Sequence, residues 1–160
     1  MKKLKIYLDT SAIGYLDENT SPREMADMLA LWEKIKQNEF DVVISDITLE
    51  EINRNRNPDK VHVLNEFLSE ISFDRVVANA EAGRVADLVK INGMLTSDKH
   101  LNDRLHIGCA VVCGAEILVS LNFKHLVNVK TIKGVRGIAI SEGYGYIEIM
   151  TPAMMINGGE

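Results

Sequence analysis

Short apolar runs alternate along this chain with segments whose apolar residues recur at helical spacing. The run from Leu4 to Leu8 predicts a buried strand, and similar runs predict strands near residues 41–44, 73–77 and 116–120. The segments between them predict helices near residues 23–37, 47–55, 59–70, 80–91 and 99–114. Strands that alternate with helices pair in parallel and bury both faces of their sheet. The sequence therefore predicts an α/β fold, a three-layer α/β/α sandwich with a mainly parallel central sheet.

The length and composition fit one domain. With 160 residues, of which 46% are hydrophobic, the chain can bury one full core but has little left for a second. We therefore expect a single domain over residues 1–160, with its motifs within residues 4–126 and a tail over residues 131–160. Glycines recur in this tail, and a late strand is expected there, ending in Tyr146 to Ile149.

Net charge and cysteine content limit which binding partners and which cellular compartment are expected for this protein. The net charge of −5 provides no general attraction to nucleic acid or anionic membranes, so a polyanion must be met by a local basic surface. Cys109 and Cys113 lie four residues apart in a predicted helix, where they are unsuited to a disulfide and are expected as reduced thiols. Lys5 and Asp9 interrupt the apolar stretch that a secretion signal would need, and no run approaches membrane-spanning length. These features favour a cytoplasmic protein that does not enter a membrane.

Asp9 is the residue whose position most strongly suggests chemistry. It stands where the first strand is expected to end, and the hydroxyl residues Thr10 and Ser11 follow it. Open α/β sheets place their ligands at the carboxyl ends of the strands, and a carboxylate buried there is costly unless its charge is compensated. The alternative is that Asp9 only caps a helix or forms a turn. We interpret Asp9 as a functional residue.

Two further carboxylates, Glu51 and Asp103, lie in early turns of later helices. Each has a structural alternative. Thr48 and Glu51 have the spacing of a capping box, and the helix dipole favours a carboxylate in a first turn, as at Asp103. If the fold gathers them with the first aspartate, the three would suit a hard cation. One residue turns a helix by about 100°, so only one of Glu50 and Glu51 can face such a site, and we expect Glu51.

The chain contains no glycine-rich phosphate-binding loop, no serine elbow and no zinc spacing of Cys and His. Four segments in order instead resemble the PIN-domain ribonucleases, the family of VapC-type toxins. They are Tyr7 to Ser11, Ser45 with Glu51 six residues later, Asp103 to Ala110, and Ile117 to Phe123. Each motif is short, and their order and spacing together carry the resemblance, which extends over residues 4–126.

The resemblance implies an acidic site for Mg²⁺ or Mn²⁺ that activates water for the cleavage of RNA. The family's ligands carry over onto Asp9, Glu51 and Asp103. At the fourth position the family usually has aspartate, whereas this chain has Asn122, which offers a carbonyl oxygen but no charge. These four are the catalytic candidates. Polar residues around them are expected to support the ligands: Ser11, Ser45, Ser120 and His106.

Residues 117–141 include no acidic residue, so a basic surface is possible there. Candidates for RNA contacts are Arg54, Arg56, Lys124 and Lys130, although they could equally be ordinary surface charges. The resemblance also implies a homodimer that a cognate antitoxin holds inactive. The expected function is thus a metal-dependent endoribonuclease, the toxin of a toxin–antitoxin pair. The alternatives are a non-catalytic PIN-like RNA-binding or scaffold protein with a weakened metal site, and a metal-dependent phosphatase.

Overall fold

Parallel strands form the centre of the computed structural model, which describes residues 2–157. In chain order these strands are β1 (Leu4–Leu8), β2 (Phe40–Ser45), β3 (Asp74–Val76), β4 (Ile117–Val119) and β5 (Glu148–Met150). Their spatial order is β3-β2-β1-β4-β5, and each neighbouring pair is parallel. The predicted α/β sandwich is confirmed, and the sheet is parallel throughout the described residues.

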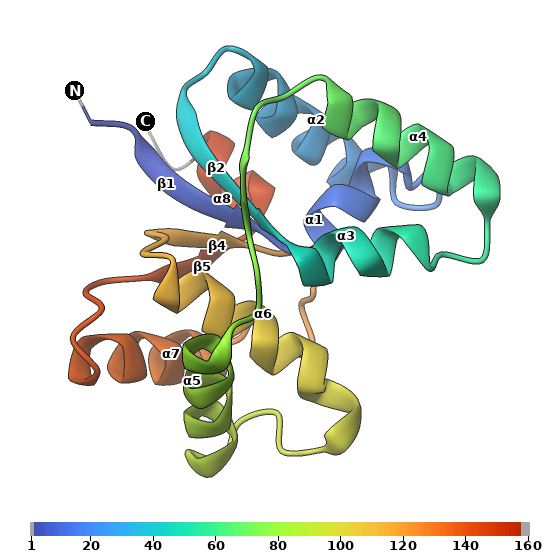
Figure 1. The fold of residues 1–160 in the computed structure, drawn as a ribbon. Helices are drawn as coiled ribbons and strands as arrows, with labels where there is room; N and C mark the ends of the chain where they lie inside the picture. The colour runs from blue at the N-terminus through green and yellow to red at the C-terminus, as the bar shows by residue number, and fades with distance from the viewer. Residues whose placement is uncertain (1, 158–160) are drawn as a thin grey trace.

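Helices cover both faces of this sheet (Figure 1). One face carries α1 (Thr10–Gly14), α2 (Pro22–Lys36), α4 (Pro58–Ser69) and α8 (Pro152–Asn157). The other carries α5 (Ala80–Ile91), α6 (Leu101–Val112) and α7 (Val129–Ser141). Helix α3 (Asp46–Asn53) follows β2 directly, and two short 3₁₀ turns, η1 (Tyr15–Asp17) and η2 (Asp98–His100), complete the described elements.

Alternating side chains of the strands divide the interior into two cores. In β1, Ile6 and Leu8 pack on the face of α2, where Trp32 is buried, whereas Tyr7 points to the opposite face, towards Ile107 of α6. This alternation follows from the two-residue period of a strand. Because both faces are covered, β1 is apolar at nearly every position, as a central parallel strand requires.

The order of the strands reverses between β1 and β4. From β1 the chain moves outward through β2 to β3, and it then returns to β4 on the other side of β1. The carboxyl ends of β1 and β4 are joined there by a hydrogen bond from the Asp9 amide to the Val119 carbonyl, 3.3 Å long. Such a reversal is where open α/β sheets leave a crevice for ligands.

The tail differs from its prediction. Residues 129–141, expected as part of a glycine-containing tail, form helix α7, whose buried face is Thr131, Val135, Ile138 and Ala139. This face has helical spacing, but Gly134 and Gly137 obscure it because glycine disfavours a helix interior. The late strand is present as β5, shorter than expected, and α8 was not predicted. Residues 1 and 158–160, which the predicted domain includes, lie outside the described residues.

Most other boundaries agree within a few residues. The predicted helix 80–91 is observed as α5 over the same residues, whereas the predicted helix 99–114 divides into η2 and α6. Within residues 2–157, no helix combines the length and the apolar character needed to cross a membrane.

Candidate functional site

Asp9 follows the last residue of β1 and is 3% exposed. Its Oδ1 accepts a hydrogen bond from the Ser11 hydroxyl (2.7 Å) and one from the backbone N–H of Ala12 (2.9 Å), which makes Asp9 the N-cap of α1. Both donors are neutral. Burial raises the pKa of Asp9 above its ordinary value, although the nearby His106 and the hydrogen bonds from Ser120 and Ser11 oppose this. The site therefore contains a buried carboxylate whose desolvation is only partly compensated.

Two serines tie the end of β4 to Asp9. Ser11, besides donating to Asp9, accepts the backbone N–H of Leu121 at 2.8 Å, and its hydroxyl lies 3.3 Å from that of Ser120. Ser120 is fully buried and accepts the backbone N–H of Asn122 at 3.0 Å. Two of the three predicted supporting serines therefore lie beside Asp9, where they connect the ends of β1 and β4.

Glu51, and not Glu50, faces this end of the sheet. Its Oε1 accepts the Thr10 hydroxyl (2.6 Å) and lies 2.7 Å from Nε2 of His106. The Glu50 side chain is 63% exposed and pairs with Arg54 on the surface. Burial alone would raise the pKa of Glu51, but the hydrogen bonds from His106 and Thr10 hold it below its ordinary value.

The capping-box alternative for Glu51 does not hold. A capping box that includes Glu51 would require Thr48 to be the N-cap of the helix. The N-cap of α3 is instead Ser45, whose Oγ accepts the Thr48 backbone N–H. The Thr48 hydroxyl instead donates to the carbonyl of Leu8 in β1, at 3.2 Å. Glu51 is thus available for the site.

Asp103 lies in the first turn of α6, as predicted, with its side chain 24% exposed. Its Oδ2 is 3.6 Å from Nδ1 of His100. The ring of His100 is in turn 4.2 Å from the ring of His125, centroid to centroid. These two histidines form a pair next to Asp103.

Asn122 occupies the turn after β4 and helps to close it. Its side-chain Oδ1 accepts the backbone N–H of His125 at 3.1 Å, and its backbone carbonyl accepts the N–H groups of Leu126 and Val127. The side-chain oxygen Oδ1, which we expected as a fourth ligand without charge, is therefore engaged in the turn.

The donor chemistry of the site fits a hard divalent cation, because Asp9, Glu51 and Asp103 supply oxygen ligands and Asp9 is buried without a charged hydrogen-bond donor. The side-chain arrangement is less complete. Across residues 2–157, no three His, Cys, Asp or Glu side chains are placed so that they could hold a metal ion. The predicted convergence of the three carboxylates is therefore not seen as a formed site.

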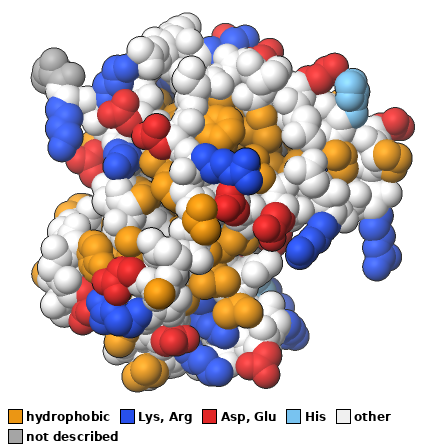
Figure 2. All heavy atoms as spheres, in the orientation of Figure 1, with side chains coloured by type: hydrophobic (Ala, Val, Ile, Leu, Met, Phe, Trp, Pro, Cys, Tyr) orange, Lys and Arg blue, Asp and Glu red, His pale blue; other side chains and the backbone are white. Residues whose placement is uncertain are grey.

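The basic candidates lie on the surface. Arg54 caps the end of α3 and pairs with Glu50, whereas Arg56 and Lys124 are exposed. Lys130 donates to the carbonyl of Gly93 at 3.0 Å. On the face that Figure 2 shows, acidic and basic side chains are interspersed and no broad basic surface appears.

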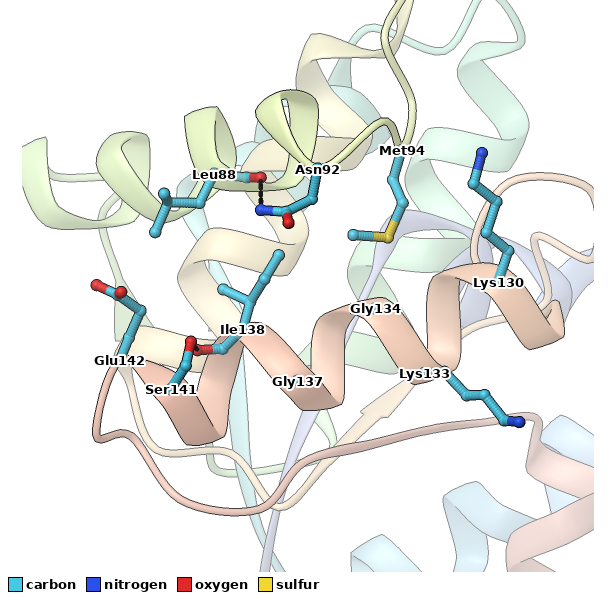
Figure 3. A pocket seen from close by; sticks show the side chains of 10 residues that line it. All are labelled: Leu88, Asn92, Met94, Lys130, Lys133, Gly134, Gly137, Ile138, Ser141 and Glu142. Carbon is cyan, nitrogen blue, oxygen red and sulfur yellow. Dashed lines mark hydrogen bonds between the residues drawn. The ribbon is translucent and has the colours of Figure 1, made fainter.

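One hollow of the surface lies away from these carboxylates. It has a volume of about 600 Å³ and lies between α5 and α7 (Figure 3). Leu88, Met94 and Ile138 make it partly apolar, and Lys130 and Lys133 border it. Asp9, Glu51 and Asp103 contribute nothing to its wall.

Both cysteines are free thiols. Cys109 is buried and Cys113 is partly buried. Burial raises the pKa of Cys109 to about 11, so its thiolate, the reactive form, is scarce at neutral pH.

Two residues that the sequence analysis did not single out are important here. The hydroxyl of Tyr7, in the middle of β1, contacts both Ser45 (2.6 Å) and His106 (2.7 Å). A tyrosine within a buried strand needs a partner for its hydroxyl, which is the signal that could have identified it. Arg104 is 5% exposed and donates to the carbonyls of Leu95 and Ser97, so it holds the loop before α6.

Comparison with models of protein families and with curated protein sequences finds no match for this chain. Comparison with solved structures does. VapBC2 from Rickettsia felis, bound to a DNA fragment from its promoter, matches with a TM-score of 0.60 and 17% identity over 92% of this chain and 98% of that chain. DNA-bound VapBC from Salmonella typhimurium matches with a TM-score of 0.55 and 17% identity, covering 93% and 98%.

A third similar structure is VapC20 from Mycobacterium tuberculosis, described as a toxin that cleaves the sarcin-ricin loop. Its TM-score is 0.57 at 13% identity, over 76% of this chain and 93% of that chain. At such identities the likeness concerns the fold. The chain has the fold of the VapC-type PIN-domain proteins, in agreement with the resemblance seen in its motifs.

Proposed function

We propose that this protein is a metal-dependent endoribonuclease of the VapC type, with Asp9, Glu51 and Asp103 as ligands of Mg²⁺ or Mn²⁺. The observation that carries the proposal is the burial of Asp9 at the point where the strand order reverses, with a raised pKa and only neutral donors. A carboxylate in this state gains most from a nearby cation. The fold shared with VapC20 supports RNA as the substrate.

When bound, the cation would supply a water of lowered pKa and would compensate the charge of a phosphate oxygen. Hydrogen bonds within the chain hold the proposed ligands in position. Ser11 and Ser120 hold the segment around Asp9 rigid, and Thr10 and His106 hold Glu51 beside it. Because no three His, Cys, Asp or Glu side chains of the described residues are arranged around one point, binding requires a side chain to move, and Asp103, which lies beside His100, is the ligand that would turn.

The partners follow from the same likeness. Two of the similar structures are VapBC complexes on DNA, which supports a cognate antitoxin for this chain as well. We further propose a homodimer in the cytoplasm, and RNA contacts through Arg54, Arg56, Lys124 and Lys130.

The alternative is that the protein has a PIN-like fold but no catalytic activity, and serves as an RNA-binding or scaffold protein. Two observations favour this alternative. Asn122 brings no charge, and its Oδ1 accepts a hydrogen bond within a turn. Among the described residues, no three His, Cys, Asp or Glu side chains are arranged so that they could hold a metal ion. Such a protein would need the fold but not the cation.

The two functions are separated by titrating the protein with Mn²⁺ in a calorimeter and by incubating it with RNA. The nuclease is expected to bind Mn²⁺ and to cleave RNA, and Glu51→Gln is expected to lose both properties. Glu50→Gln is the matched control, because it changes the adjacent residue on the exposed side of α3. Absence of Mn²⁺ binding at millimolar concentration would favour the scaffold, and turnover of an aryl phosphate but not of RNA would favour a phosphatase.

A further inference from the structure

A chain of hydrogen bonds runs through the buried side of the site and links β1, α6, α3 and the end of β2. It begins at Ser45, the N-cap of α3, whose Oγ is 2.6 Å from the hydroxyl of Tyr7 in β1. The Tyr7 hydroxyl is 2.7 Å from Nδ1 of His106 in α6, and Nε2 of His106 is 2.7 Å from Oε1 of Glu51. The chain of bonds therefore begins at the residue that caps α3 and ends within α3, at Glu51.

The chemistry of the two ends sets the direction of the bonds at those ends, and the neutral Nε2–H form of His106 sets the direction of the two bonds that Tyr7 makes. The Glu51 carboxylate only accepts, so Nε2 of His106 must carry the proton that joins them. At the other end the Thr48 backbone N–H only donates, and Ser45 Oγ accepts it. In a neutral imidazole protonated at Nε2, Nδ1 is an acceptor, so Tyr7 donates to His106 and Ser45 donates to Tyr7. Each donor in this sequence then has one acceptor.

The members of the chain of bonds differ in burial, and only the last one reaches the surface. Tyr7 and Ser45 are fully buried and His106 is 3% exposed, whereas the Glu51 side chain is 31% exposed. A glutamate side chain on a helix surface has several rotamers, and holding it in one of them costs conformational entropy. The bonds from His106 and Thr10 both end on Oε1, so they can restrain the carboxylate while its other oxygen lies outside these two bonds.

We propose that His106 is a positioning residue of the site: its Nε2–H holds Glu51 beside the segment that follows Asp9, and Tyr7 fixes the orientation of its ring. Both ring nitrogens are engaged, which leaves no lone pair of His106 for a cation. His106 therefore acts through Glu51. The consequence for metal affinity rests on the proposed function, whereas the hydrogen-bond direction does not.

The direction is tested without any metal by NMR of the protein labelled with ¹⁵N-histidine. The wild-type protein is expected to show His106 protonated at Nε2, and Glu51→Gln is expected to shift the Nε2–H resonance while Glu50→Gln leaves it in place. A His106 ring with its proton on Nδ1 only, or a resonance equally indifferent to both substitutions, would overturn the proposal.

The positioning role is tested with two isosteric variants of His106. His106→Gln places an amide N–H near the position of Nε2, so it can still donate to Glu51. His106→Asn reaches only the position of Nδ1, so it keeps a partner for Tyr7 and loses the bond to Glu51. Loss of such a supporting bond weakens metal binding by about 10- to 100-fold. We expect this loss of Mn²⁺ affinity by calorimetry for His106→Asn, and recovery to within a few-fold of wild type for His106→Gln.

Thermal unfolding of each variant without metal shows whether the fold is retained, and Tyr7→Phe, which removes only a hydroxyl, replaces any histidine variant that does not fold. Tyr7→Phe is expected to weaken Mn²⁺ binding and to alter the His106 resonances. Wild-type Mn²⁺ affinity in folded His106→Asn or in Tyr7→Phe would overturn the positioning role. If the wild-type protein binds no Mn²⁺ at all, the proposed function fails, and the NMR experiment alone decides the role of His106.

Discussion

Oδ1 of Asp9 accepts the backbone N–H of Ala12 at 2.9 Å. This bond makes Asp9 the N-cap of α1, so the structural alternative for this residue is correct and does not exclude a role in metal binding. A carboxylate has two oxygens, and capping engages one of them. The cap and the charge can be separated by substitution.

Asp9→Asn keeps a side-chain oxygen for the cap and removes the charge. In the absence of divalent cations we expect it to be as stable as the wild-type protein or more so, because the desolvation of the carboxylate is relieved. Asp9→Ala removes the cap as well, which costs about 0.5–2 kcal/mol of stability. Urea unfolding with a chelator present measures both variants. Loss of Mn²⁺ binding in both, with stability lost only in Asp9→Ala, is the expected pattern, and retained RNA cleavage in Asp9→Asn would contradict the role of the charge.

The raised pKa of Asp9 predicts a pH dependence of stability with a definite sign. Below its ordinary value of 3.8 the carboxyl group is protonated in both folded and unfolded states, and its favourable contribution is fully present. As the pH rises through the raised folded-state pKa, this contribution is lost. The free energy of unfolding of Asp9→Asn relative to wild type should therefore increase from acidic to neutral pH and level off there.

This comparison isolates Asp9 because Glu51 acts in the opposite direction. The pKa of Glu51 is lowered, so its contribution is present above its ordinary value of 4.5 and is lost as the pH falls through the folded-state pKa. Glu51 is present in both proteins, and its effect largely cancels in the difference. A difference that is constant with pH would mean that burial does not penalise the Asp9 charge.

Asn122→Asp tests the fourth position. The carboxylate can still accept the His125 backbone N–H, so the turn is expected to survive, and the added charge should tighten Mn²⁺ binding and raise cleavage at low metal concentration. Asn122→Ala is the control for the turn, and losing the hydrogen bond should cost it about 0.5–1.5 kcal/mol of stability. Calorimetry of Asn122→Asp with Mn²⁺ checks the first expectation. Unchanged affinity would show that this side chain serves the turn alone.

Gly108 brings α6 close to α5. A Cβ added there would lie 2.2 Å from the backbone carbonyl oxygen of Ala82, and a backbone atom cannot move aside as a side chain can. We expect Gly108→Ala to destabilise the protein by about 1–3 kcal/mol or more. Gly83→Ala in α5 is the matched control, because nothing lies within 4 Å of its added Cβ, and alanine there should stabilise the helix by about 0.4–1 kcal/mol. Thermal or urea unfolding compares the two, and equal stability of both variants would contradict the close approach of α5 and α6.

Local patterns in the sequence were sufficient for much of the framework. The apolar run from Leu4 to Leu8 identified β1 and its end at Asp9, and the helical period identified α5 at its observed residues. The same reasoning missed α7, because Gly134 and Gly137 lower the helix propensity that its buried face would otherwise support. In that segment tertiary packing of Val135 and Ile138 outweighs local propensity.

The sequence by itself determined the alternation of strands and helices and the placement of Asp9 at a strand end, since both follow from local apolar patterns. Its PIN-like motifs, and not a period, indicated Glu51 rather than Glu50. Only the tertiary structure decided the partners of these groups. Four separate elements contribute Tyr7, Ser45, Glu51 and His106, and no periodicity in the chain indicates that their polar atoms meet. The engagement of Asn122 in a turn and the incomplete gathering of the carboxylates were equally hidden. Hydrogen bonds depend on distances of a few tenths of an ångström between residues far apart in sequence, and those distances are set by packing.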